Sequence, residues 1–330
     1  MVREKAGWEL KEGSTTYGKV SNDELWTVMN RAFSGQSKKT TSYKYALIRA
    51  LLESLYQVDE NLRISFEVLS TSFSKLYWNL IIKHKYTQGK NAQINTILSN
   101  IKLQHQLPDE IPYDSLSLLI KNEINTAIQS AVINRYVLGA LYKDTEGLLY
   151  GFNKKDKILQ FNPAAYEFLL KFQEVLFRLN NYELTRFIQS RNESHSNEVI
   201  INNIENITKR ESLTVYRELL LTYSEPRCFY TNAKLVEGKD KIVVDHFIPW
   251  SFVHSDHLWN FVLTTPSLNS RKSNKLPSSE YVNKLFLRNE RLTNVTDQNV
   301  REEFAKYKKS TVEKLYDYAE INGFQTGWTP

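Results

Sequence analysis

The chain has 330 residues, which is long enough for a sizeable core and for two domains. Its 41% hydrophobic and 24% charged residues are ordinary for a soluble globular protein, and no apolar run approaches the roughly 18 residues that a membrane span needs. The net charge of +6 suits a polyanionic partner such as nucleic acid, and the single cysteine excludes an internal disulfide.

Most of the chain carries helical patterns, after irregular residues 1–20. Ser21 and Glu24 form a capping box ahead of apolar residues at helical spacing, which predicts a helix over 22–33. Two apolar runs around a polar turn predict a β-hairpin near 148–161. Further helices are predicted over 43–55, 66–86, 92–104, 115–142, 163–179, 183–190, 211–223, 278–291 and 297–321.

A basic loop follows the first predicted helix. Lys38, Lys39 and Lys44 stand there among hydroxyl groups and a tyrosine, a mixture that suits contacts with phosphate and sugar. A solvated loop between two helices explains the same residues equally well, so the sequence leaves both interpretations open.

The most informative stretch lies in the last third of the chain. An apolar, β-branched run predicts a buried strand that ends at Asp245 and His246, and a second run at 258–263 can pair with it. Thr265 and Pro266 predict the start of a short helix, because threonine caps helices and proline fits the first helical position. The local order is therefore strand, loop, strand, helix.

The polar residues of this stretch suit phosphodiester hydrolysis. His246 is a candidate general base, because a neutral histidine with an unperturbed pKa of about 6.5 accepts protons near pH 7. Mg²⁺ prefers oxygen ligands and often takes only one or two protein groups, which Asp245 and Asn269 can supply. Asn260 has both donors and an acceptor, so it can brace the loop that carries His246.

Basic residues follow the predicted metal-binding asparagine. Arg271, Lys272 and Lys275 are placed to meet the phosphates of a nucleic-acid backbone. The alternative is that they are ordinary charges on the surface of a helix.

The order Asp245, His246, Asn260, Asn269 resembles the HNH, or ββα-metal, nuclease family. The resemblance covers about 226–280 and is closest to the HNH domains of RNA-guided CRISPR effector nucleases and of bacterial defence and restriction enzymes. It implies that Asp245 and Asn269 bind one Mg²⁺, for which Mn²⁺ can substitute, that His246 is the general base, and that Asn260 is structural. All four are therefore catalytic-site candidates.

The chain departs from many HNH proteins at the zinc knuckle. Such a knuckle uses paired cysteines, whereas Cys228 is the only cysteine here, so we expect no structural zinc and a small buried thiol instead. His254 and His257 flank the motif in a polar loop, and we expect them to be solvated rather than bound to metal.

The predicted fold is mainly α with a small α+β module. Residues 1–224 would form a mainly helical region for recognition or partner docking, 225–290 the ββα-metal nuclease module, and 291–330 a C-terminal helical segment that packs on the body. The N-terminus has no secretory h-region, which together with the lone cysteine predicts a cytoplasmic protein without a membrane partner.

The predicted function is a Mg²⁺-dependent endonuclease that cuts DNA. The resemblance implies a setting in bacterial restriction or antiphage defence, in which a protein of the defence system is a candidate partner. An RNA-cleaving or partner-activated nonspecific nuclease is one alternative, and a catalytically inert nucleic-acid-binding protein is another. The sequence does not decide sequence specificity or oligomeric state.

Overall fold

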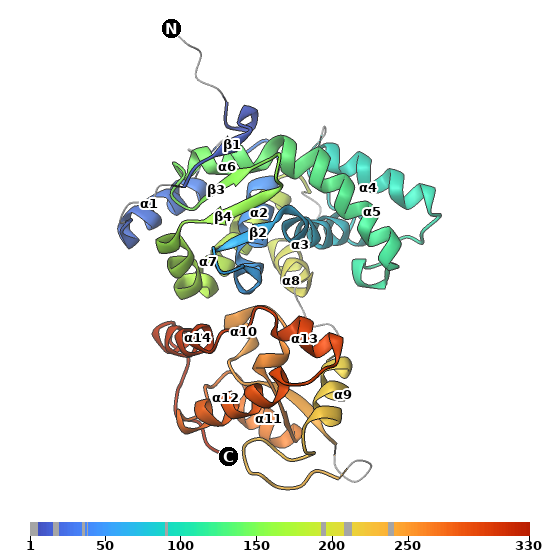
Figure 1. Cartoon of the computed structure of the whole chain (residues 1–330). Helices are drawn as coiled ribbons and strands as arrows, with labels where there is room; N and C mark the ends of the chain where they lie inside the picture. The colour runs from blue at the N-terminus through green and yellow to red at the C-terminus, as the bar shows by residue number, and fades with distance from the viewer. Residues whose placement is uncertain are drawn as a thin grey trace. The chain divides into compact units, whose positions relative to one another are not determined.

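The computed structural model describes residues 6–15, 20–34, 37, 39–89, 92–192, 196–207, 213–236 and 241–330. The chain is mainly helical, with a four-stranded and a two-stranded antiparallel sheet (Figure 1). The predicted class, mainly α with a small α+β module, is confirmed. Packing divides the chain into two compact units. The first holds Met1–Leu169 and Val175–Lys209, and the second holds Leu170–Glu174 and Arg210–Pro330.

Helices make up most of the first unit, and two of them begin at predicted caps. At the start of α1, Ser21 Oγ accepts a hydrogen bond from the Glu24 N–H at 3.2 Å, and the Glu24 carboxylate accepts one from the Ser21 N–H at 2.8 Å. At the start of α7, the Asn162 side chain accepts from the Ala164 N–H, next to the proline at the first helical position. The helices are α1 (Asn22–Phe33), α2 (Tyr43–Glu53), α3 (Phe66–Trp78), α4 (Gln93–Gln104), α5 (Leu118–Ile128), α6 (Leu138–Asp144), α7 (Pro163–Gln189) and α8 (Asn197–Ile207).

Some helix boundaries differ from the predicted ones because packing overrides the local pattern. The helix predicted over 115–142 is instead α5, the π-helical segment η5 (Gln129–Val137) and α6. The helices predicted over 163–179 and 183–190 both lie in α7, which continues through the two buried asparagines between them and has a kink at Phe172. Helix α8 has no predicted counterpart.

The sheet of the first unit has the strand order β1-β3-β4-β2. Its centre is the predicted hairpin, formed by β3 (Tyr150–Asn153) and β4 (Ile158–Phe161). The edge strands β1 (Glu12–Gly13) and β2 (Arg63–Ser65) are two and three residues long, too short for a periodic pattern to reveal.

The second unit contains the predicted strand, loop, strand and helix. β5 (Val243–His246) pairs with β6 (Phe261–Thr264) in antiparallel register, so that Asp245 lies opposite Val262. α11 (Pro266–Lys272) follows, capped by the Thr265 hydroxyl, which accepts from the Leu268 N–H at 3.4 Å. The other helices are α9 (Thr214–Tyr223), α10 (Trp250–Val253), the short 3₁₀ turn η6 (Leu258–Asn260), α12 (Glu280–Thr293), α13 (Gln298–Phe304) and α14 (Lys309–Ile321).

The C-terminal residues return to the segment that follows α11. The Leu276 N–H donates to the Gln325 carbonyl at 2.8 Å, and the Trp328 N–H donates to the Leu276 carbonyl at 3.0 Å. The Trp328 ring then packs edge-on against Tyr230, with 4.9 Å between the ring centroids. The second unit thus contains α9, α13, α14 and this C-terminal tail as well as the β5–β6 hairpin. The domain boundaries at 224 and 290 remain a prediction.

A helix that crosses a membrane has to be both long and apolar. Across the described ranges, no helix combines the length and the apolar character that a crossing would require.

Candidate active site

Asp245 is buried on β5 between a phenol and an ammonium group. Its side chain is only 5% exposed. The Tyr230 hydroxyl donates to Oδ2 at 2.6 Å, and the Lys272 ammonium lies 3.2 Å from the same oxygen. Burial raises the pKa of Tyr230 well above its usual range, and the charge of Asp245 adds to the effect, so the phenol keeps its proton and donates.

Lys272 does not lie where phosphates of a substrate would meet it. It is fully buried at the end of α11, and its ammonium donates to the His246 carbonyl at 2.6 Å as well as contacting Asp245. The phosphate contact predicted for Lys272 is therefore corrected. The reason is that helix periodicity turns this residue toward the hairpin, where a carboxylate and a carbonyl compensate its charge.

His246 lies on the other face of β5, since neighbours on a strand point to opposite sides. Its side chain is 3% exposed and packs edge-on against Phe261, with 4.6 Å between ring centroids. Its Nε2 lies 2.7 Å from Oδ1 of Asp256, a residue of the loop between the strands. Asp256 was not predicted as a site residue, because an acidic residue ten positions further along a polar loop gives no local sign of this contact.

Asn260 joins the two ends of the loop that separates the strands. It is fully buried. Its Oδ1 accepts from the Ile248 N–H and its Nδ2 donates to the Ile248 carbonyl, both at 2.9 Å. The Phe247 N–H also donates to the Asn260 carbonyl at 2.8 Å. The side chain thus satisfies both backbone groups of Ile248, a buried residue two positions after His246, which fixes the course of the chain there.

Asn269 lies one turn before Lys272 on α11. It is half-buried and lines a shallow pocket of about 320 Å³ together with Val243. Val243 and Asp245 are two residues apart on β5 and so share a face of the strand. Both metal-binding candidates, Asp245 and Asn269, are therefore placed along the contact of α11 with one face of β5.

This donor set suits a hard cation held by few protein groups. It consists of one carboxylate and one amide oxygen, and Mg²⁺ commonly takes one or two such ligands and keeps several waters. In the part of the chain that the structure describes, no group of three or more His, Cys, Asp or Glu side chains is placed to bind a metal ion. Lys272 competes with a cation for Asp245.

The remaining basic candidates are placed differently from one another. Arg271 is exposed and Lys275 is half-buried, both after Asn269. In the first unit, the Lys39 ammonium donates to the Ser34 carbonyl at 2.7 Å at the end of α1, and Lys44 pairs with Asp144 at 2.5 Å. These two lysines thus make contacts that stabilise the fold, although both also line a cavity of about 880 Å³. Lys38 lies outside the described residues.

The two flanking histidines are not solvated as predicted. His257 stacks on Trp259 with 4.9 Å between ring centroids, and burial lowers the pKa of His257 to about 4. His254 is half-buried, with its ring 5.4 Å from that of Trp250. Contacts with the two tryptophans place both histidine rings partly inside the protein. The polar residues around the histidines in the sequence gave no sign of these contacts. The prediction for Cys228 is confirmed, since the thiol is buried.

Comparison with known proteins finds one family. Residues 228–278 match the family model described as HNH endonuclease. Neither the curated proteins nor the solved structures gave a match to the chain. The matched residues contain β5 with Asp245 and His246, η6 with Asn260, β6, and α11 with Asn269. The strand–strand–helix segment of this chain therefore matches the HNH endonuclease family, in agreement with the resemblance seen in the sequence.

Proposed function

We propose that the chain is a divalent-cation-dependent endonuclease that hydrolyses phosphodiester bonds in DNA. The observation that carries this proposal is the arrangement on β5, where Asp245 and His246 follow one another and each is held by side chains of its own. Asp245 contacts Tyr230 and Lys272, and His246 contacts Asp256. A ligand for the cation and a base are thus presented from the two faces of one strand.

In the proposed reaction His246 takes a proton from the attacking water. Asp256 at Nε2 favours the tautomer with the proton on that nitrogen, which makes Nδ1 the accepting nitrogen. The water oxygen then forms a bond to phosphorus as the bond from phosphorus to the leaving oxygen breaks. The leaving oxygen takes a proton from solvent. Asp256 stabilises the imidazolium that forms, as a carboxylate does when it orients a catalytic histidine.

Asp245 and Asn269 would hold the cation, Mg²⁺ or Mn²⁺. When bound, it supplies charge that neutralises the phosphoryl and leaving oxygens. Lys272 would give up its contact with Asp245 and keep the one with the His246 carbonyl, since the two contacts use different protons of the ammonium group. Asn260 acts by positioning, because it fixes the backbone directly after His246.

Arg271 and Lys275 are proposed to contact the DNA backbone near the cut. They lie two and six residues after Asn269, and Arg271 is exposed. The first unit is proposed to recognise DNA or dock a partner protein, with bacterial restriction or antiphage defence as the setting and the cytoplasm as the compartment. Its basic cavity around Lys39 and Lys44 supports this role only in part, because both lysines also hold the fold.

Cleavage of supercoiled plasmid tests this function. Purified protein is incubated with plasmid and Mg²⁺, in parallel with samples that contain EDTA and with the His246→Ala variant. We expect relaxed or linear plasmid only for the wild-type protein with Mg²⁺. A parallel structured RNA separates DNA from RNA as the substrate. Cleavage that persists in EDTA, or that equals the wild-type rate in the variant, would refute the mechanism.

A further inference from the structure

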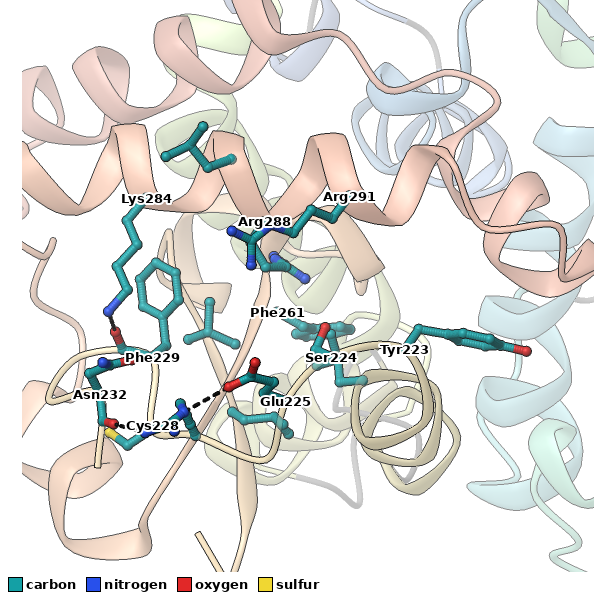
Figure 2. A pocket seen from close by; sticks show the side chains of 15 residues that line it. Tyr223, Ser224, Glu225, Cys228, Phe229, Asn232, Phe261, Lys284, Arg288 and Arg291 are labelled. Carbon is teal, nitrogen blue, oxygen red and sulfur yellow. Dashed lines mark hydrogen bonds and ion pairs between the residues drawn. The ribbon is translucent and has the colours of Figure 1, made fainter. Parts of the chain in front are cut away.

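A second cavity lies in the same unit. It has a volume of about 460 Å³, and its walls come from the end of α9, the loop that follows, β6 and α12 (Figure 2). This volume is in the range of small-ligand sites, about 300–1,000 Å³. None of Asp245, His246, Asn260 and Asn269 lines it.

One wall of the cavity is a row of cations. Lys284, Arg288 and Arg291 are four and three residues apart on α12, which places them on one face of the helix. Figure 2 shows their side chains running from α12 toward the loop that carries Glu225 and Cys228. Glu225 is the one acidic residue among the described residues of the lining, and it pairs with Arg227 at 2.8 Å. The cavity therefore has a strong excess of positive charge.

Arg288 is the most unusual member of the row. Its two terminal nitrogens donate to the carbonyls of Leu258 and Trp259, each at 3.2 Å. Its Nε is buried and has no hydrogen-bond partner in the part of the chain that the structure describes. Burial lowers the pKa of Arg288 to about 9, and no carboxylate among the described residues offsets that effect. Arg288 as a whole is half-buried, but its Nε is buried, and a desolvated guanidinium without a neighbouring carboxylate is costly, so an anionic ligand would stabilise it.

The other two cations differ in how they are held. The Lys284 ammonium donates to the Phe229 carbonyl and lies 5.0 Å from the centre of the Phe229 ring. Arg291 is exposed, and no hydrogen bond or ion pair of its guanidinium occurs within the described ranges. Two guanidinium groups at the mouth and the floor of one cavity suit a phosphate, because each can present two N–H groups to it.

Apart from the charged residues and the polar Ser224 and Asn232, the lining is apolar or aromatic. Phe261 and Leu263 of β6 are buried, while Tyr223 and Leu287 expose 36% and 58% of their surface at the edge of the cavity. Flat apolar and aromatic side chains beside cations suit a nucleic-acid base, since stacking on an aromatic ring tolerates every base. The combination of a cationic wall and an apolar edge fits one nucleotide.

We propose that this cavity binds one nucleotide, with its phosphate on Arg288 and Arg291 and its base against Tyr223 and Leu287. The nucleotide belongs either to the strand that the enzyme cuts or to a free nucleotide, and in the first case the inference rests on the proposed function. The cavity adjoins the active site through two residues. Val262 lines it and pairs with Asp245 across the hairpin, and Phe229 lines it and precedes Tyr230.

Binding without cleavage tests the inference. Fluorescence anisotropy measures the affinity of labelled single-stranded and duplex DNA in EDTA over a salt series, so no catalysis is needed. Arg291→Ala is the main variant, because the side chain is exposed and its guanidinium makes no hydrogen bond or ion pair among the described residues. Lys308→Ala removes the same charge from an exposed position outside the lining and serves as the control.

We expect Arg291→Ala to weaken DNA binding about five- to tenfold and to lower the salt slope by roughly 0.7–0.9, the value for one lost phosphate contact. Lys308→Ala should change neither quantity. Calorimetric titration with AMP separates the two sources. If AMP binds with an affinity that Arg291→Ala abolishes while DNA binding is unchanged, the ligand is a free nucleotide.

The inference is overturned if Arg291→Ala behaves like Lys308→Ala toward both DNA and AMP. Arg288→Lys provides a second test of phosphate binding, since it keeps the positive charge but removes the paired N–H donors of the guanidinium. Its affinity for the same ligand should also fall, with the melting temperature recorded to check the fold. If plasmid is not cut but binding still depends on Arg291, the proposed function fails and the binding site stands.

Discussion

The two faces of β5 hold neighbouring residues in different ways. On one face Asp245 is buried against a cation, Lys272, and a phenol that donates to it. On the other face His246 meets an acid, Asp256. A divalent cation at Asp245 would compete with Lys272 for its ligand, whereas the Asp256 contact at Nε2 of His246 favours the tautomer in which Nδ1 accepts the proton. The comparison indicates that cation affinity and base orientation are set on separate faces and can be changed separately.

The largest effect is expected on the histidine face. His246→Ala should lower the rate of cleavage by about 10²–10⁴-fold, because a positioned general base contributes that much. The affinity for DNA in EDTA should change little. The melting temperature should fall, because the variant loses the packing of a buried ring against Phe261 and the contact with Asp256. Gel assays of plasmid cleavage and anisotropy measurements check the two halves. A rate close to wild type in the folded variant would remove His246 from the mechanism.

On the aspartate face the largest effect is expected on stability. Lys272→Met removes the buried ammonium and leaves the Asp245 carboxylate with Tyr230 alone, and loss of one partner of a buried pair costs about 3–5 kcal/mol. We therefore expect a clear fall in the free energy of unfolding, measured by urea denaturation. Mg²⁺ should restore part of the loss, because it supplies positive charge beside the same carboxylate.

The control for this variant is Lys308→Met, which changes an exposed lysine of the same unit. It should leave stability and its Mg²⁺ dependence unchanged. Equal Mg²⁺ stabilisation of wild type and Lys272→Met would show that lysine and cation do not share Asp245.

The β5–β6 hairpin and α11 could both be predicted from the sequence, for physical reasons. Apolar β-branched runs predict strands, and Thr265 with Pro266 predicts a helix start, because these signals are local. The bracing contact of Asn260 was also expected from its donors and acceptor. The helix class of the first unit followed from periodicity in the same way.

The partners on the two faces were not predictable from the sequence. Lys272 reads as a surface charge, and only the packing of α11 on β5 turns it inward to Asp245. Asp256 reads as part of a polar loop, and only the path of that loop brings it to His246. Both depend on contacts between distant positions, which a local pattern does not record.

A smaller effect is expected when the partner of His246 is changed. Asp256→Asn keeps the size of the side chain and removes its charge, so it weakens the orientation of the imidazole. We expect a fall in kcat of about ten- to a hundredfold, as is typical of side chains that orient catalytic groups. KM and the Mg²⁺ requirement should stay unchanged, because the aspartate face is untouched. A change in the Mg²⁺ requirement would mean that the two faces are coupled.

The smallest effect is expected at Asn269, where the aspartate face can be adjusted without breaking the buried pair. Asn269 is half-buried beside Val243, so its loss leaves little space to refill and should cost little stability. Asn269→Ala removes one of two proposed oxygen ligands, and the Mg²⁺ concentration for half-maximal cleavage should rise about tenfold. Asn269→Asp keeps an oxygen at the same place and should recover most of the affinity. Ser270→Ala, an exposed neighbour that lines the same shallow pocket, is the matched control. If Asn269→Ala lowers the rate at saturating Mg²⁺ by as much as His246→Ala does, Asn269 acts in the chemical step itself, and the division of labour between the two faces of β5 fails.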